Sequence, residues 1–180
     1  MRCFVAVECP GEVKEKLLCV EREIRGLGDM TLVRPENMHL TMKFLGEIPE
    51  DRVGSVSSAL SAIDYKAYTL AVKGIGVFPK PDYVRVIWAG VEDFGMTTNL
   101  ASRIDEAVLP LGFPKDDKFH PHITIARVKF VKDRNALKNL LQSKTGEAYG
   151  EYKAERMVLM KSILSPKGPE YSVIKEFKFK

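Results

Sequence analysis

Two short segments of the chain carry the same pair of chemically active residues at the same spacing. His39 is followed two positions later by Thr41, and His122 is followed two positions later by Thr124. Apolar and β-branched residues fill the intervening positions, which predicts strands, and side chains two apart on a strand share a face. Each imidazole should therefore stand beside a hydroxyl, with the apolar residues turned into a core. The chain has only three histidines, so the repeated pair needs a common explanation.

Two such strands facing each other suit general acid–base catalysis. An imidazole has an unperturbed pKa of about 6.5, so near neutrality one ring can accept a proton while the other donates one. Each role typically contributes on the order of 10²–10⁴-fold to a rate. The hydroxyls of Thr41 and Thr124 can hold phosphoryl oxygens whose charge grows in the transition state.

The other motifs of phosphate and acyl chemistry are missing from the sequence. It contains no Asp-rich metal cradle, no Gly-rich nucleotide loop and no Gly-x-Ser-x-Gly elbow. The chemistry should therefore need neither metal nor cofactor. A cyclic phosphodiester fits this condition, because ring strain makes it reactive enough for acid–base catalysis alone.

Apolar periodicity predicts the elements that must position the two pairs. Helices are expected at about 10–26, 49–63, 96–110 and 133–142. Strands are expected at 2–8, 30–34, 39–45, 67–78, 83–91, 119–129, 149–163 and 171–179. The turns at 79–82 and 166–169 should make hairpins of the strands that flank them.

The two halves of the sequence echo each other around the motifs. A Leu-Gly pair lies shortly before each motif histidine, and an Asp-Arg pair lies at a similar distance after it. Two related units of helix and antiparallel strand, paired about a pseudo-two-fold axis, would place the motifs face to face. We expect a single domain over 1–180, made of two pseudo-symmetric lobes with motif 1 at 39–42 and motif 2 at 122–125.

The bulk composition sets wider limits. A length of 180 residues suits one domain, and 45% hydrophobic with 29% charged residues is ordinary for a globular protein. The net charge of +4 leans only mildly toward a polyanionic partner. No apolar run is long enough to cross a membrane. Cys3, Cys9 and Cys19 lack metal-ligand spacing, which favours reduced thiols and a cytoplasmic location.

The segments 39–46 (HLTMKFLG) and 119–127 (FHPHITIAR) resemble the paired motifs of the 2H phosphoesterase superfamily. They are most similar to its RNA 2′,3′-cyclic phosphodiesterase branch, historically called 2′-5′ RNA ligase. The resemblance covers the whole chain, because the opening strand at 2–7, the approach to motif 1 at 33–37 and the closing hairpin at 159–171 are also similar to that branch. There is no departure at the motif positions.

The resemblance implies a bilobal α+β fold of the LigT-like type, in which two antiparallel sheets line a central cleft and helices lie outside. It implies hydrolysis of RNA 2′,3′-cyclic phosphate ends to 2′-phosphomonoesters, without cofactor or metal. His39 inherits the role of proton donor, His122 that of proton acceptor, and Thr41 and Thr124 the role of holding the phosphate. Some members also join RNA ends through a 2′-5′ bond.

The same resemblance sets the expected partners. They are RNA with a 2′,3′-cyclic phosphate end, tRNA fragments included, or small cyclic nucleotides. No membrane is expected as a partner, and the protein is expected to be a monomer.

Two further residues near motif 1 are candidates for phosphate contact. Lys43 shares the alternation of His39 and Thr41, so it can reach a phosphate or lie on a solvated edge. Arg34, just before the motif, is a candidate for contact with an RNA phosphate. On or near the predicted hairpin, Phe78, Tyr83 or Trp88 could stack a terminal base, although Trp88 is better suited to the core.

For two further residues near motif 2, strict alternation does not settle whether the side chain faces the cleft. Arg127 has the wrong alternation for the His122 face unless a bulge intervenes. Strict alternation would put His120 on the cleft face, but Pro121 disturbs the local pairing and favours a structural role for His120.

Two alternatives stay open. His39, His120 and His122 could be the three ligands of a zinc hydrolase, although this would leave both threonines without a role. The chain could also be a non-catalytic module that binds RNA ends. Turnover of a cyclic-phosphate oligonucleotide in the presence of a strong chelator would exclude both alternatives.

Overall fold

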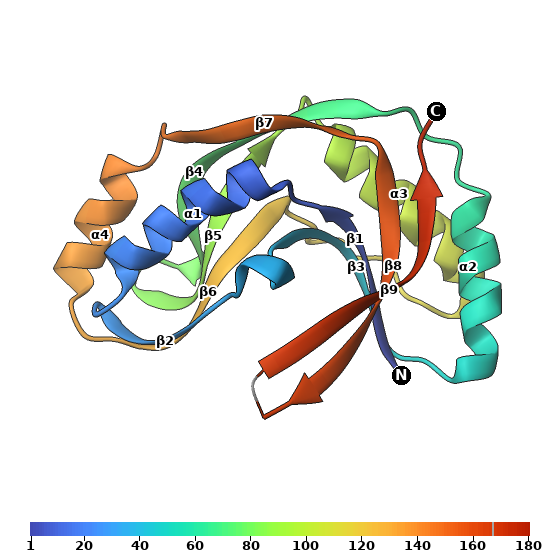
Figure 1. The fold of residues 1–180 in the computed structure, drawn as a ribbon, viewed down its shortest axis with the longest axis horizontal. Coiled ribbons are helices and arrows are strands. Elements are labelled where there is room, and N and C mark those ends of the chain that lie inside the picture. Colours follow the sequence, from blue (N-terminus) through green and yellow to red (C-terminus); the bar gives the residue numbers. More distant parts are fainter. Residues whose placement is uncertain (167) are drawn as a thin grey trace.

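A computed structural model describes residues 1–166 and 168–180 and contains a curled antiparallel sheet with helices packed on it (Figure 1). The strands are β1 (Arg2–Glu8), β2 (Gly28–Leu32), β3 (His39–Glu47), β4 (Tyr68–Lys80), β5 (Tyr83–Glu92), β6 (His122–Val131), β7 (Ala148–Ala154), β8 (Arg156–Ser165) and β9 (Gly168–Lys178). The helices are α1 (Gly11–Ile24), α2 (Val53–Ser61), α3 (Met96–Val108) and α4 (Arg134–Ser143), with 3₁₀ turns at Pro35–Asn37, Glu50–Arg52 and Leu109–Leu111. None of the described helices is long and apolar enough to cross a bilayer.

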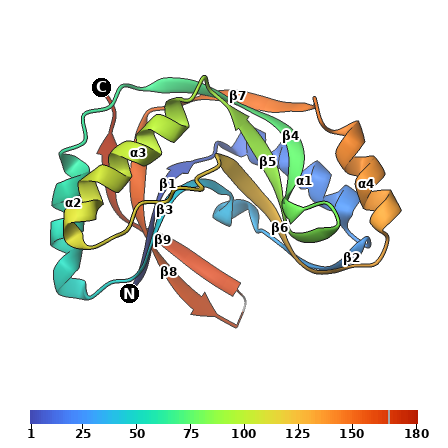
Figure 2. The ribbon, with the colours of Figure 1, turned by 180° about the vertical axis from the view of Figure 1, so that it is seen from behind.

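The strand order divides the sheet into two halves. Neighbouring strands follow the order β7-β4-β5-β6-β3-β1-β8-β9, and β2 pairs with β6 beyond the point where β3 leaves it. The two halves meet at β3 and β6, the motif strands, which are paired through Leu40 and Ile123. Figures 1 and 2 show α1 and α4 over one half and α2 and α3 over the other.

The helices form where the apolar stripes predicted them. In α1 the stripe residues Val13, Leu17, Val20 and Ile24 are all buried, and the helix packs on β6 and β7. Helix α3 buries the corresponding stripe of its own against β3. One apolar face per helix is sufficient to hold it on a sheet whose inner residues are equally apolar.

Helix α4 begins at the predicted cap. The side chain of Asp133 accepts a hydrogen bond from the backbone N–H of Ala136 over 2.8 Å, which satisfies one of the free donors of the first turn. The predicted hairpin of β4 and β5 is also present, with antiparallel pairing from Ala71 and Glu92 to the turn.

Two differences between the predicted and observed strands have a clear physical cause. The strand expected over 149–163 is two strands, because β7 pairs with β4 in one half and β8 pairs with β1 in the other, with Glu155 between them. Strand β6 begins at His122 rather than at 119, since Pro121 has no N–H to donate to a ladder. The turn predicted at 166–169 lies partly outside the described residues.

Candidate active site

A cavity of about 260 Å³ opens between the two halves of the sheet, and all four motif residues line it. Leu40 and Ile123, at the contact of the two motif strands, are fully buried. Because neighbouring side chains on a strand point to opposite faces, the residues that flank this pair face the cavity instead. The remaining lining residues are Thr31, Leu32, Val33, Arg34, Asn37, Phe44, Val86, Arg127, Gly168, Pro169 and Tyr171.

His122 is oriented by its own backbone. Its Nδ1 lies 2.7 Å from the carbonyl oxygen of His120. A carbonyl only accepts, so Nδ1 carries the hydrogen and Nε2 carries the lone pair when the ring is neutral. Burial lowers the pKa of His122, and the nearby charges of His120 and Arg127 lower it further, while the carbonyl hydrogen bond opposes this shift.

His39 sits in an aromatic setting on the other half. Its ring stacks on Phe4 with centroids 4.9 Å apart and planes inclined by 24°, and the ring of Tyr171 meets it edge-on at 5.4 Å. Burial lowers the pKa of His39 to about 4, although a hydrogen bond to the backbone of Asn37 opposes the shift. Each motif histidine is thus tied to the backbone two residues before it, and each is neutral by itself at pH 7.

A β-bulge in β3 changes the alternation after motif 1. Thr41 and Lys43 pair with consecutive residues of β1, so Met42 is the extra residue. Such an insertion moves the following side chains to the opposite faces. Phe44 consequently lines the cavity with 69% of its surface exposed, and the strict alternation used on the sequence missed it.

The prediction that Lys43 shares the face of His39 is therefore wrong. The Lys43 side chain is 6% exposed and turns away from the cavity into the core of its half. Its Nζ lies 2.5 Å from Oδ1 of Asp105 and donates a hydrogen bond to the carbonyl of Pro114. Lys43 joins β3 to α3 and to the loop after it, and does not line the cavity.

A matching bulge in β6 brings Arg127 into the cavity. Thr124 and Ala126 pair with consecutive residues of β5, so Ile125 is the extra residue. Arg127 lines the cavity as a result, and its charge lowers the pKa of both motif histidines. This is the bulge on which the prediction of a cavity-facing Arg127 depended.

Of the two other predicted site residues, Arg34 lines the active-site cavity and His120 does not. Arg34 lines the cavity, with Nη1 3.7 Å from Oε1 of Glu36. The ring of His120 lies outside it and packs 5.0 Å from Trp88 and 5.5 Å from Phe78. The backbone of His120, rather than its ring, serves the site by holding His122.

The positions of the three histidines test whether they could together ligate a zinc ion. Among residues 1–166 and 168–180, no group of three or more His, Cys, Asp or Glu side chains is placed to hold a metal ion. His120 faces a different cavity from the one that His39 and His122 share. The structure thus brings two of the three proposed ligands together and leaves out the third.

Comparison with known proteins agrees with this geometry. The family model described as "LigT like Phosphoesterase" matches residues 7–88 and 95–171. A protein of Archaeoglobus fulgidus named RNA 2′,3′-cyclic phosphodiesterase is 34% identical, over 98% of this chain and 99% of its own. One of the same name from Methanocaldococcus jannaschii is 36% identical, over 98% of this chain and 100% of its own.

A solved structure extends the likeness to the fold. A crystal structure of a Thermus thermophilus protein superposes with a TM-score of 0.84 at 31% identity, covering 99% of this chain and 98% of that one. It confirms the predicted α+β fold of the LigT-like type. The two predicted antiparallel sheets are the two halves of one curled sheet, joined through Leu40 and Ile123. The chain therefore belongs to the LigT-like phosphoesterase family, within the 2H phosphoesterase superfamily.

Proposed function

We propose that this protein hydrolyses the 2′,3′-cyclic phosphodiester at RNA ends to a 2′-phosphomonoester. The observation that carries the proposal is that both His-x-Thr pairs line one cavity, with Arg127 beside them. The relatives named above carry that activity in their names. Because each half supplies one pair, residues 1–180 act as a single catalytic domain.

The geometry suggests how the protons move. His122, whose Nδ1–H is held by a carbonyl, offers the Nε2 lone pair to the attacking water and takes its proton. As the water oxygen bonds to phosphorus, the bond from phosphorus to the 3′ oxygen breaks. His39 gives its proton to that leaving oxygen, and the phosphate remains on the 2′ oxygen.

The phosphate itself supplies the charge that His39 needs. His39 is neutral by itself at pH 7 and can act as an acid only after it gains a proton. A phosphodiester anion beside the ring favours the protonated form, because opposite charges a few ångströms apart raise the pKa of a base. Substrate binding therefore increases the fraction of His39 that carries the proton.

The growing negative charge on the phosphate is met by groups of this chain. The hydroxyls of Thr41 and Thr124 donate hydrogen bonds to the non-bridging oxygens, and the Arg127 guanidinium neutralises their charge. Arg34 is placed to contact a neighbouring RNA phosphate. We propose that the reaction runs without metal or cofactor, because two imidazoles make both proton transfers.

The same pair permits one further reaction. A 5′-hydroxyl that attacks in place of water, with its proton taken by His122, would join two RNA ends through a 2′-5′ bond. The proposed setting is a cytoplasmic monomer that acts on RNA ends, tRNA fragments included, or on small cyclic nucleotides.

Identification of the product tests the proposed reaction. With an oligonucleotide ending in a 2′,3′-cyclic phosphate, and with a strong chelator present, we expect the 2′-phosphomonoester, identified by phosphorus NMR. A 3′-phosphomonoester would mean that the 2′ oxygen, and not the 3′ oxygen, is the leaving group. No turnover would favour the RNA-end-binding module, and turnover that stops on chelation and returns with zinc would favour the zinc hydrolase.

The pH dependence should show the lowered histidine pKa values. The profile of kcat/KM reports the free enzyme, in which the donor must be protonated and the acceptor neutral. Both pKa values lie below 6.5 in the free protein, so kcat/KM should be highest on the acid side of about pH 6.5 and fall as the pH rises. The falling limb of kcat should lie at higher pH, because bound phosphate raises the pKa of His39. A flat kcat/KM between about pH 5 and 9 would rule out two titrating imidazoles.

A further inference from the structure

A second cavity, of about 550 Å³, lies where the far end of β6 meets the tip of the β4–β5 hairpin and helix α4. Its floor includes the buried side chains of Val84 and Leu137. Its rim is basic and aromatic. We call it the basic groove and define it by Tyr83, Arg85, Lys129, Phe130, Arg134 and Lys138.

The positive charge of the basic groove is not neutralised within the protein. Its four cationic side chains are all exposed, and the only carboxylate that lines the cavity is that of Asp82. Within the described part of the chain, none of the four has a carboxylate within 4.0 Å. A cluster of like charges around a hollow attracts a polyanion.

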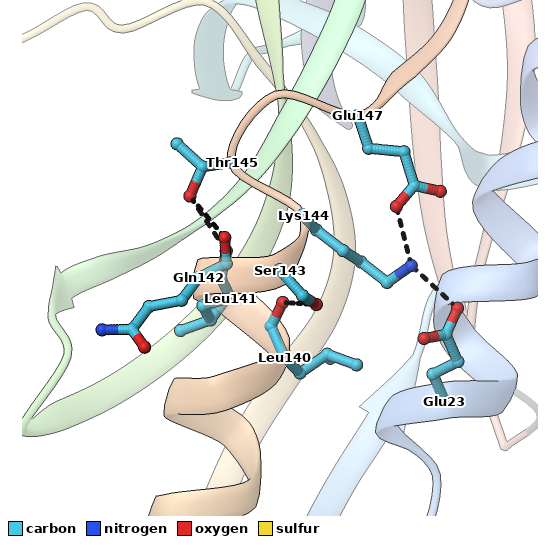
Figure 3. Close-up of polar contacts among 8 residues, drawn as sticks. All are labelled: Glu23, Leu140, Leu141, Gln142, Ser143, Lys144, Thr145 and Glu147. Carbon is cyan, nitrogen blue, oxygen red and sulfur yellow. Dashed lines mark hydrogen bonds and ion pairs between the residues drawn. The ribbon is translucent and has the colours of Figure 1, made fainter.

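Lys144, at the end of α4, contrasts with the lysines of the basic groove, because it is paired with two carboxylates (Figure 3). Lys144 is buried and lies 2.9 Å from both Glu23 and Glu147. Burial alone would lower the pKa of Lys144, but these two carboxylates outweigh it and raise the pKa. This contact ties α4 to α1, so the helix presents Arg134 and Lys138 on a fixed support.

The aromatic side chains of the basic groove offer flat apolar surfaces to solvent. Tyr83 is 51% exposed and Phe130 is 61% exposed. The Arg85 guanidinium lies 4.6 Å from the centroid of the Tyr83 ring and donates hydrogen bonds to the Tyr83 hydroxyl and to the carbonyl of Lys129. Aromatic rings and stacked guanidinium groups are the surfaces on which single-stranded nucleic acids stack their bases.

Two strands, β5 and β6, contribute residues both to the basic groove and to the active-site cavity. On β6, Arg127 lines the active-site cavity and Lys129 lines the groove. On β5, Val86 lines the cavity and Arg85, its neighbour, lines the groove. Two residues of a strand span about 7 Å, so the two cavities lie a short distance apart along β6.

We propose that the basic groove binds the RNA strand on the 5′ side of the cyclic phosphate. Lys129, Arg134 and Lys138 contact its phosphates, and the Tyr83–Arg85 pair and Phe130 stack its bases. The inference rests on the proposed function, because it takes the cyclic end to lie between the two histidines. Binding of the strand in the basic groove should make the enzyme prefer an oligonucleotide over a mononucleotide with the same cyclic phosphate.

The test compares two substrates and two charge-reversal variants. The groove variant is Arg134→Glu with Lys138→Glu. The control is Lys66→Glu with Arg103→Glu, which makes the same charge change at exposed positions on the other half. The substrates are a 2′,3′-cyclic mononucleotide and an oligonucleotide of about ten residues with the same cyclic end, at low salt.

We expect the groove variant to lose about 10- to 100-fold in kcat/KM for the oligonucleotide, mainly through KM, and to keep its mononucleotide activity. Fewer phosphate contacts should also make the oligonucleotide rate less steep in salt than that of the wild type. The inference is overturned if groove and control variants lose equally, or if the mononucleotide rate falls as much as the oligonucleotide rate.

The outcome also separates this inference from the proposed function. A wild-type protein that turns over neither substrate refutes the proposed function, while oligonucleotide binding, followed by fluorescence anisotropy, still tests the groove. Normal turnover with no groove effect refutes the groove alone. The groove would instead be assigned to a protein partner under two conditions. The groove variant would keep wild-type activity on the oligonucleotide, and it alone would fail to bind an acidic protein that the wild type and the control variant bind.

Discussion

Replacing either motif histidine, as His39→Ala or His122→Ala, is expected to lower kcat/KM for a 2′,3′-cyclic-phosphate oligonucleotide by about 10²–10⁴-fold. Each variant loses one of the two proton transfers, and the remaining imidazole cannot make both in the same step. The loss should appear mainly in kcat, because Thr41, Thr124 and Arg127, the proposed phosphate contacts, are unchanged. Steady-state kinetics on folded protein, checked by circular dichroism, measures the effect.

The third histidine supplies a matched control for these variants. His120→Ala removes an imidazole outside the active-site cavity but keeps the backbone carbonyl that orients His122. It should therefore change kcat/KM far less than either motif variant. Because the proposed mechanism uses both motif histidines in one step, the double variant should be only slightly less active than the less active single variant. Turnover like that of the wild type in His39→Ala or His122→Ala would refute the proposed acid–base pair.

The second large effect concerns stability rather than catalysis. Lys43→Met should lower the free energy of unfolding by about 3–5 kcal/mol, because it leaves the Asp105 carboxylate buried without its partner. Both side chains of the pair are at most 10% exposed, so solvent screens little of their interaction. Denaturant unfolding measures the loss. KM for a cyclic mononucleotide should stay unchanged, since Lys43 does not line the cavity.

A double variant controls for the change in shape at Lys43. In Lys43→Met with Asp105→Asn, no buried charge is left alone, and the amide oxygen can still accept the backbone N–H of Asp116, which lies 2.9 Å from the carboxylate. Much of the lost stability should return. If instead Lys43→Met raised KM and left the stability intact, Lys43 would be a phosphate ligand, as alternation along the strand first suggested.

The parts of this protein that depend on local chemistry could be predicted from the sequence. The stripe from Val13 to Ile24 requires a helix with one buried face wherever the chain places it. Asp133 caps α4 because a side chain can reach a donor three residues away without help from the rest of the fold. The two His-x-Thr pairs could be found for the same reason, since alternation over three residues needs only an extended backbone.

The predictions from sequence failed where pairing with a neighbouring strand determines which face a side chain occupies or where a strand ends. Alternation fails after Thr41 because the extra residue Met42 exists only in the pairing of β3 with β1, which no local pattern records. The expected strand over 149–163 looks continuous in the sequence, but its two parts pair in different halves of the sheet. Arg127 likewise departs from strict alternation, because Ile125 is an extra residue in the pairing of β6 with β5.

The sequence by itself determined which residues can do chemistry here: two imidazoles, each beside a hydroxyl, and the apolar residues that hold their strands. Only the tertiary structure decided which charges join them and in what protonation state. The pairing of β3 with β1 and of β6 with β5 turned Lys43 away and brought Arg127 in. Burial, to which the packing against Phe4 and Tyr171 contributes, lowered the pKa of His39. Both effects arise because pairing register and burial are set by residues far apart in the chain.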